Sequence, residues 1–157
     1  PLRIGTMILK NRFVMTPMNT NYSDANGCMT PQMEEYYVRR AKGGAGLIVL
    51  EAVAVTPDTR NHGVQPMLCD EKYVPAWSNL IERLQSYGAK VSIELAHFGS
   101  EATLAPRASA SGVSRFPGVE VQAASLFLCI CLYYTRKLWD FRDSVPKRRQ
   151  LCYNELI

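Results

Sequence analysis

The residues best suited to chemistry lie in three places, each at the end of a short apolar run. They are the segments 16–19, 51–52 and 94–99, which together offer hydroxyl, amide, carboxylate and imidazole side chains. Such groups can bind a polar ligand or move a proton. In proteins built from alternating strands and helices, ligand sites gather at the carboxyl ends of the strands. We therefore expect these three segments to form one ligand site.

Some of these residues have both a structural and a functional interpretation. His97 either packs at a strand end as a histidine with satisfied hydrogen bonds or faces a ligand, and its neighbours in sequence do not decide between the two. Glu51 is more readily interpreted as a structural hydrogen-bonding or charge-paired group than as a general base. Met33, Tyr36 and Tyr37 are expected in the core.

The first strand and helix that position these segments are marked by their boundaries. A small hairpin over 4–9 is expected to lead into a strand over 13–15, and Pro17 marks its end because proline cannot donate to a strand ladder. Thr30 and Pro31 are typical of a helix start, and Gly43 of a helix end. Helical spacing of apolar residues between these boundaries predicts an amphipathic helix.

Two further strands and one helix follow. The nearly continuous apolar run 46–55 is typical of a strand buried on both faces of a parallel sheet. A helix is predicted from about 71 to 87, and a strand over 90–95. Strands that alternate with amphipathic helices indicate an α/β protein with a parallel sheet. The apolar stripe expected on the second helix consists of Val74, Trp77, Ile81 and Leu84.

Composition limits the class of protein. The chain has 157 residues, of which 47% are hydrophobic, as expected for one globular core. Residues 1–123 hold 12 Lys and Arg against 11 Asp and Glu, so most of the net charge of +4 belongs to residues 124–157. Residues 1–123 show no cluster of Lys and Arg on an element of a recognisable nucleic-acid-binding fold, so no nucleic-acid partner is expected. The chain begins at Pro1 without a methionine, so we expect missing or processed N-terminal residues.

The cysteines favour a reducing compartment. Five cysteines are an odd number, they are scattered, and no secretory segment opens the chain. A cytoplasmic location is therefore expected. Cys129 and Cys131 are separated by one residue, whereas zinc ligands usually have about two to four residues between them, so no metal site is expected.

The last part of the sequence departs from the pattern of the first. We predict a boundary near residue 123, with domain 1–123 followed by a non-homologous tail 124–157 that contains no βα repeat. The tail's apolar run of about a dozen residues is too short to span a membrane. Translation out of frame or a misjoined gene would produce such a tail. The alternative is an independently evolved membrane-surface appendage with apolar and basic portions.

Two parallel βα architectures compete for the front of the chain. A doubly wound dinucleotide-binding sheet would carry its glycine fingerprint directly after the first strand. Here Thr16, Pro17 and Met18 follow that strand, and the cluster Gly43, Gly44, Gly46 precedes a strand instead. The glycines therefore favour a barrel.

Three blocks of sequence make a more specific identification. They are LKNRFVMTPMNT (9–20), YYVRRAKGGAGLIVLEAVAV (36–55) and SIELAHFGS (92–100). In this order they resemble the first three strand regions of the old yellow enzyme family of flavin oxidoreductases. The third block is most similar to the branch that contains 2,4-dienoyl-CoA reductase and the bile-acid-inducible oxidoreductases. The resemblance covers about residues 2–122.

The resemblance implies a fold, a cofactor and a reaction. The family fold is a (β/α)8 TIM barrel with FMN over its carboxyl face. NAD(P)H reduces the flavin, which passes hydride to an activated C=C bond of a small unsaturated substrate. The chain would then be the N-terminal part of such a barrel, with about three βα units. An iron–sulfur cluster and FAD belong only to a full-length parent of the dienoyl-CoA reductase type.

The resemblance also implies roles for individual residues. Thr16, Pro17 and Met18 match the backbone platform beside the flavin ring, and Asn19 matches a position that tunes its potential. Ala52 matches a small residue after the second strand. Small residues and proline leave room for a flat ring, and one polar side chain recognises its pyrimidine edge. The remaining positions are Glu94, which matches that polar side chain, and two candidates for the substrate side, Tyr22 and His97.

Two positions depart from the family pattern. Glu94 stands where the family commonly has Gln, and an ionised carboxylate accepts hydrogen bonds but cannot donate them. It can still accept from the ring N–H. Ser100 stands where the family often has Arg near the flavin or its phosphate. Tyr22 also has a simpler interpretation, because a loop tyrosine more often serves packing.

A TIM barrel takes about 250 residues and eight strands, and this chain supplies three strands. The catalytic residues are therefore unknown and expected in the missing C-terminal part. Two function classes remain. The first is an FMN-dependent oxidoreductase in truncated form; the alternative is an inactive remnant that associates with other polypeptides, or with itself, through an exposed sheet edge.

Overall fold

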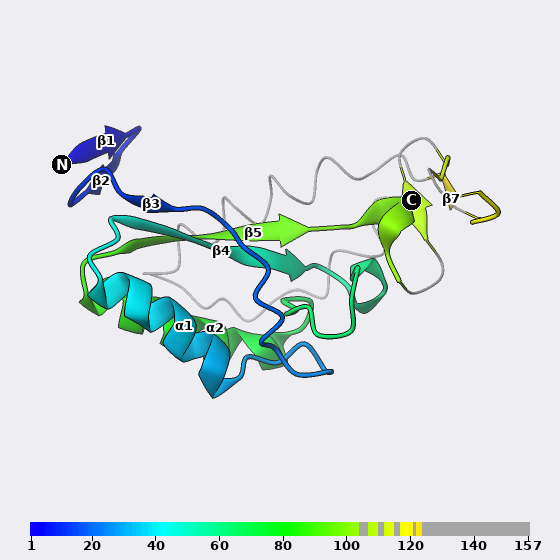
Figure 1. Ribbon diagram of the computed structural model, residues 1–157, viewed down its shortest axis with the longest axis horizontal. Helices are drawn as coiled ribbons and strands as arrows, with labels where there is room; N and C mark the ends of the chain where they lie inside the picture. Colours follow the sequence, from blue (N-terminus) through cyan, green and yellow to red (C-terminus); the bar gives the residue numbers. More distant parts are fainter. Residues whose placement is uncertain (104–106, 110–111, 115–116, 121, 124–157) are drawn as a thin grey trace.

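The computed structural model describes residues 1–103, 107–109, 112–114, 117–120 and 122–123. Its centre is a three-stranded parallel sheet in the order β3-β4-β5. The strands are β3 (Val14–Met15), β4 (Leu47–Ala54) and β5 (Lys90–Ala96). Two helices, α1 (Pro31–Lys42) and α2 (Val74–Ser86), lie against the same face of this sheet (Figure 1). The strand–helix alternation predicted from the sequence is thus the observed order.

Smaller elements surround this sheet. The antiparallel hairpin of β1 (Leu2–Ile4) and β2 (Met7–Leu9) lies near the amino ends of the sheet strands in Figure 1. Three 3₁₀ turns occur in the connections of the described residues, and β6 pairs with β7 in parallel at the far end of the molecule from the hairpin (Figure 1). Their bounds are η1 (Pro57–Thr59), η2 (Glu71–Tyr73), η3 (Gly99–Glu101), β6 (Ala108–Ser109) and β7 (Gln122–Ala123). The predicted tail 124–157 lies outside the described residues.

Helix α1 begins and ends as its sequence predicts. Thr30 caps it, with its Oγ1 accepting a hydrogen bond from the Met33 backbone N–H at 3.3 Å, and Pro31 opens the first turn. Its buried face consists of Met33, Tyr37, Val38 and Ala41. Tyr36, expected in the core, is only half-buried, because it lies at the rim of this face.

The second predicted helix is divided in the structure. Asp70 accepts a hydrogen bond from the Lys72 backbone N–H at 3.0 Å and caps the 3₁₀ turn η2, and α2 begins only at Val74. The buried stripe of α2 is Trp77, Leu80 and Leu84, whereas the predicted members Val74 and Ile81 are half-buried. Trp77 and Leu84 are buried as predicted, whereas Leu80 takes the central position of the stripe in place of its neighbour Ile81.

The hydrophobic core lies between the two helices and the sheet. On β5, Val91, Ile93 and Leu95 pack into this core. Ser92 and Glu94 are exposed, because they point to the opposite face. The sheet therefore has one face covered by helices and another that carries polar side chains. Among the described helices, none is long and apolar enough to cross a membrane.

A β-bulge interrupts β4 at Glu51. Leu50 pairs with Ile93, and the next registered pair is Ala52 with Glu94, so Glu51 has no partner on β5. An extra residue of this kind bends the strand and redirects its side chain. The bulge lies in the part of β4 that contains the predicted site residues Glu51 and Ala52.

Candidate functional site

The three predicted segments lie beside one another at the carboxyl ends of β3, β4 and β5. Thr20, next to Asn19, is hydrogen-bonded to Glu51. Ala52, next to Glu51, is paired in register with Glu94 of β5. The chain segment after β3, the end of β4 and the end of β5 are therefore joined by direct contacts, in the order that the parallel sheet imposes.

A buried carboxylate anchors the segment that follows β3. Glu51 is completely buried. Its Oε2 accepts from the Thr20 backbone N–H at 2.9 Å, and its Oε1 accepts from the Thr20 hydroxyl at 2.6 Å. The same hydroxyl accepts from the Tyr22 backbone N–H at 3.2 Å. The structural interpretation of Glu51 as a hydrogen-bonding group is thereby confirmed.

Tyr37 completes the partners of Glu51. Its hydroxyl donates to Glu51 Oε1 at 3.0 Å and accepts from the Glu51 backbone N–H at 3.0 Å. Burial, reinforced by the Glu51 charge, raises the pKa of Tyr37 far above its ordinary value. The phenol therefore remains a donor throughout the physiological pH range and ties α1 to the bulge of β4.

Gln65 is a site residue that sequence reasoning missed. It is completely buried, and its Nε2 donates to the Ala52 carbonyl at 3.0 Å. Its Oε1 accepts from the Asn61 backbone N–H at 3.0 Å. Gln65 thus holds the loop after β4 against the backbone of Ala52. A single polar residue in a loop carries no periodic signal, so only the fold reveals this role.

The predicted cofactor-binding residues differ in their exposure. Thr16, Met18 and Asn19 are exposed, and Pro17 is half-buried. Ala52 is buried, whereas Glu94, its registered partner on the neighbouring strand, is exposed. Paired residues on adjacent strands point to the same face. The small side chain of Ala52 and the carboxylate of Glu94 therefore lie side by side on the face away from the helices.

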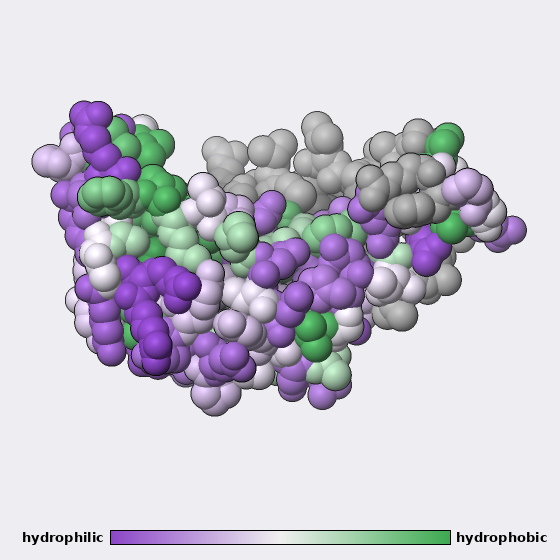
Figure 2. Space-filling view, viewed as in Figure 1, coloured by the Kyte–Doolittle hydropathy of each residue, from purple (hydrophilic) through white to green (hydrophobic). Residues whose placement is uncertain are grey.

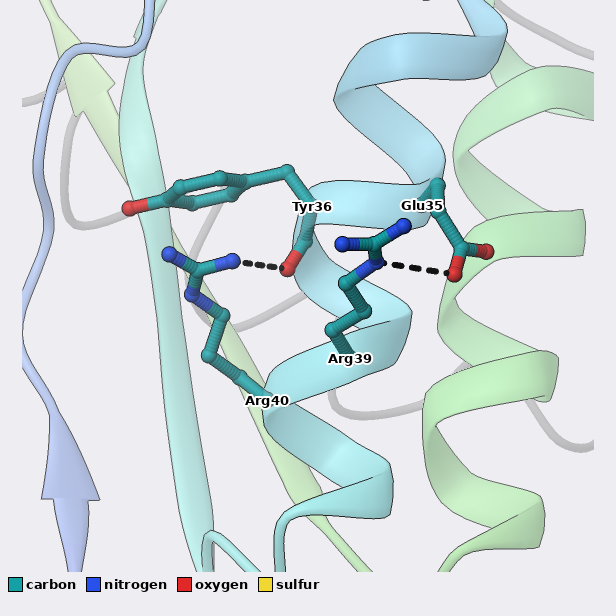
Figure 3. A network of polar contacts seen from close by, with 4 residues as sticks. All are labelled: Glu35, Tyr36, Arg39 and Arg40. Carbon is teal, nitrogen blue, oxygen red and sulfur yellow. Dashed lines mark hydrogen bonds and ion pairs between the residues drawn. The ribbon is translucent and has the colours of Figure 1, made fainter.

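Tyr22 packs against helix α1. Its ring meets that of Tyr36 edge-to-face, with ring centroids 5.8 Å apart. The Arg40 guanidinium also lies 3.4 Å from the centroid of the Tyr36 ring and donates to the Tyr36 carbonyl at 2.8 Å (Figure 3). The packing interpretation of Tyr22 matches this geometry, and its role toward a substrate stays a prediction.

Two histidines lie in the loops at this end of the sheet. His97 is half-buried directly after β5, and its Nδ1 accepts from the Gly99 backbone N–H at 2.9 Å. Burial lowers the pKa of His97, and the Asp58 carboxylate opposes that decrease. Burial likewise lowers the pKa of His62. Both ring nitrogens of His62 are covered without a hydrogen-bond partner in the described part of the chain.

The described cysteines show no metal-binding arrangement. Cys28 and Cys69 are free thiols, and burial raises the pKa of Cys69. Within the described ranges, no three His, Cys, Asp or Glu side chains gather as a metal ion would require. Cys129, Cys131 and Cys152 lie outside those ranges.

Curated relatives match the same part of the chain. An NADH oxidase from Thermoanaerobacter brockii is 42% identical over 102 residues, which are 64% of this chain and 16% of the relative. An NADPH dehydrogenase from Bacillus subtilis is 37% identical over 105 residues, which are 66% of this chain and 31% of the relative. The chain therefore spans less than a third of the length of these two relatives.

Solved structures show the same fold. The old yellow enzyme from Pichia sp. AKU4542 superposes with a TM-score of 0.70 at 27% identity, over 80% of this chain and 37% of that enzyme. The old yellow enzyme from Trypanosoma cruzi gives a TM-score of 0.61 at 26% identity, over 65% of this chain and 27% of that enzyme. The predicted fold, an N-terminal part of a TIM barrel, is confirmed.

The family model described as the NADH:flavin oxidoreductase / NADH oxidase family matches residues 1–139, which is more than half of the chain. The match agrees with the relatives and with the structural neighbours, and it confirms the family resemblance predicted from the sequence. The chain therefore belongs to the NADH:flavin oxidoreductase / NADH oxidase family.

Proposed function

We propose that this chain is the flavin-ring-binding part of an FMN-dependent oxidoreductase, present here as a truncated copy of its barrel. The reaction is the transfer of hydride from NAD(P)H, through the flavin, to an activated C=C bond of a small molecule. The observation that carries the proposal is the register of Ala52 with Glu94, beside a segment 16–20 that Glu51 anchors.

The residues of this end of the sheet suit a flat aromatic ring. Ala52 adds almost no volume to the face where it lies, and the exposed Glu94 beside it provides hydrogen-bond acceptors at one edge. Backbone groups of Thr16, Pro17 and Met18 would hold the ring from the end of β3, with Asn19 next to it. Bound FMN supplies a ring that accepts hydride from a nicotinamide and donates it to an unsaturated carbon.

The protein's own contribution at this site is orientation. Glu51 holds Thr20 by two hydrogen bonds, and Gln65 holds the Ala52 carbonyl, so the backbone on two sides of the proposed ring position is fixed. Rigid placement of this kind reduces the conformational entropy lost when a ligand binds. Tyr22 and His97 are the candidates for the substrate side. Groups that hold the substrate carbonyl or the FMN phosphate belong to later barrel strands.

The second candidate function is that of an inactive remnant that associates through its open sheet edge. The favouring observation is that β3 and β5 each pair on only one side within the described sheet. Flavin content separates the two functions. A remnant carries no flavin in any context, whereas the proposed function requires stoichiometric FMN once the rest of the barrel is present.

The test uses a full-length barrel that carries residues 1–123 of this chain. We expect FMN at about one per polypeptide and anaerobic bleaching of the flavin by NADPH or NADH. Ala52→Leu should reduce FMN binding by obstructing the ring, whereas Val113→Ala, at an exposed position outside the three-stranded sheet, should leave it unchanged. A folded barrel without flavin, or equal loss in both variants, would contradict the proposal.

Other features of the proposal rest on sequence reasoning. We place the protein in the cytoplasm because of its cysteine usage, and we expect no nucleic-acid partner. An iron–sulfur cluster and FAD would belong to a full-length parent of the dienoyl-CoA reductase branch.

A further inference from the structure

The loop between β3 and α1 contains the only Asn–Gly pair of the sequence, Asn26 and Gly27. Asn26 is exposed, whereas Gly27 is buried. In Figure 1 this loop lies at the lower edge of the molecule, and Figure 2 shows hydrophilic residues along that edge. Asn26 is therefore accessible to water, while the backbone that follows it is packed against the rest of the fold.

The packing around residue 27 requires glycine. Its φ of 71° lies in the left-handed region, and a Cβ at this position would lie 2.6 Å from Cγ of Met67. A glycine that follows asparagine has no side chain to obstruct an attack of its backbone nitrogen on the asparagine amide. The fold thus imposes, directly after Asn26, the residue type that leaves an asparagine chemically least stable.

The reaction open to this pair is deamidation through a cyclic imide. The Gly27 backbone nitrogen loses its proton and bonds to the side-chain carbonyl carbon of Asn26, and the side-chain amide nitrogen leaves as ammonia. Water then opens the imide ring at either of its carbonyls and leaves aspartate or isoaspartate. The reaction consumes only water. It requires a Gly27 nitrogen that is free to approach the Asn26 side chain.

In the folded turn the Gly27 nitrogen is engaged elsewhere. Its N–H donates to the Asp24 carbonyl at 3.0 Å, and the Asp24 N–H donates to the Cys28 carbonyl at 3.0 Å. The Asp24 carboxylate oxygen Oδ1 accepts from the backbone N–H groups of Asn26 and Cys28 at 2.9 and 2.8 Å. Asp24 therefore closes the turn 24–28 through both its backbone and its side chain.

The backbone carbonyls of residues 25, 26 and 27 are also held from outside the turn. In that order they accept from Arg60 Nη1 at 3.0 Å, the Tyr73 hydroxyl at 2.9 Å and the Met67 backbone N–H at 3.0 Å. An isoaspartate at residue 26 would route the main chain through its side chain, which adds a methylene group and displaces the following carbonyl. These contacts cannot then all be kept, so a turn modified in this way does not close again.

We propose that Asn26 is a deamidation site that the closed turn 24–28 protects and that reacts when this turn opens. Opening frees the Gly27 nitrogen, so the rate of deamidation follows the population of the open turn. Because isoaspartate prevents closure, each such event permanently alters the loop that follows β3. The proposal is independent of the proposed redox function, since no step of it uses FMN.

The test follows deamidation in a full-length barrel that carries residues 1–123 of this chain. The barrel is incubated at mildly alkaline pH in heavy-oxygen water, either folded or unfolded in urea, and its tryptic peptide 13–39 is analysed by mass spectrometry. We expect residue 26 to gain labelled oxygen at least about tenfold faster in urea than in the folded barrel. Asn19 and Asn21 lie in the same peptide, neither precedes a glycine, and both serve as internal references.

Substitutions at Asp24 test the role of the turn. Asp24→Ala removes the acceptor of two backbone hydrogen bonds and should raise the rate at Asn26 in the folded barrel about tenfold. Asp24→Asn keeps an acceptor oxygen and should stay within about twofold of the unaltered barrel. Asp70→Ala is the matched control, because Asp70 caps a different turn by accepting from the Lys72 backbone N–H at 3.0 Å. It should leave the rate at Asn26 unchanged.

Hydrogen exchange at the Gly27 amide measures the opening of the turn without a substitution, and circular dichroism checks that each variant is folded. Slow exchange at this amide is expected in the folded barrel, and fast exchange would overturn the proposal. Equal deamidation in the folded and unfolded barrel would also overturn it, as would a rate at Asn26 in urea no higher than at Asn19 and Asn21. Equal acceleration by Asp24→Ala and Asp70→Ala would assign the reaction to general unfolding and would contradict control by this turn.

Discussion

The carboxylate of Glu51 holds Thr20 at two points, through the backbone N–H at 2.9 Å and the hydroxyl at 2.6 Å. Thr20 lies 31 residues earlier in the chain, directly after the segment that we propose to contact FMN. No positively charged side chain is paired with this carboxylate among the described residues. The buried charge is therefore stabilised by hydrogen bonds, which makes the arrangement sensitive to the loss of any one of them.

Glu51→Gln should lower the free energy of unfolding by about 2 kcal/mol, because an amide nitrogen would face a donor of Thr20 or Tyr37. Tyr37→Phe should cost about 1–3 kcal/mol, because the buried Glu51 backbone N–H loses its acceptor, and should leave both Thr20 bonds in place. Urea denaturation of a full-length barrel that carries residues 1–123 of this chain, followed by circular dichroism, measures both. Hydrogen exchange at the Thr20 amide should rise more in Glu51→Gln than in Tyr37→Phe; equal exchange would show that Glu51 does not anchor this segment.

Gly46→Ala should destabilise the fold by about 1–3 kcal/mol, because overpacking forces shifts in a tightly packed region. A Cβ at residue 46 would meet the Asn11 side chain and lie 2.9 Å from the Asn11 carbonyl oxygen, which cannot easily move. Gly63→Ala is the matched control, since nothing lies within 4 Å of its Cβ position. In a full-length barrel that carries residues 1–123, the thermal unfolding midpoints of the two variants should differ clearly, and similar midpoints would contradict the predicted clash.

Glu94→Gln, in a full-length barrel that carries this segment, should keep or tighten FMN binding. An amide both donates and accepts toward the pyrimidine edge of the ring, whereas the carboxylate only accepts. One added hydrogen bond is worth about 1 kcal/mol, which is several-fold in affinity. Fluorescence titration with FMN measures the change. Much weaker binding in the Gln variant would mean that the negative charge itself is required.

Stability should decrease as the pH falls below about 6.5, the ordinary pKa of histidine. Burial lowers the folded-state pKa of both His62 and His97, so the unfolded chain binds more protons in this range. At a pH above the histidine pKa of the unfolded chain, these residues contribute their full stabilisation. That contribution is lost as the pH falls from the pKa of the unfolded chain through the lower histidine pKa of the folded protein. Unfolding of a full-length barrel that carries residues 1–123, measured at about pH 5 to 8, should show a smaller pH dependence when both residues are replaced by Gln.

The chain expressed alone should contain no flavin and should associate heterogeneously. Within the part of the chain that the structure describes, the three parallel strands leave both edges of the sheet unpaired, and Phe13 and Met18 are exposed. The residues proposed here contact the ring and not the phosphate, so tight FMN binding is not expected. Absorbance spectroscopy and light scattering check this. A yellow monomer with equimolar FMN and a cooperative thermal transition would show that the chain is a functional domain by itself.

Local chemistry allowed the sequence to predict the elements themselves. Thr30 and Pro31 define the start of α1, because helix capping and proline geometry act within a few residues. The apolar run 46–55 indicates β4, because a strand buried on both faces needs apolar residues throughout. The order of three sequence blocks also identified the family. The spacing of apolar residues did not predict that η2 and α2 are separate elements. Their separation depends on how Asp70 caps the turn η2.

Contacts between distant residues were decided only by the tertiary structure. The bulge at Glu51 changes which residue pairs with Glu94, and at this bulge Tyr37 on one helix and Thr20 in one loop donate to the same carboxylate. The role of Gln65 depends on the approach of its loop to Ala52, 13 residues away. Such contacts have no sequence period, because the geometry of the packed sheet and helices brings their partners together.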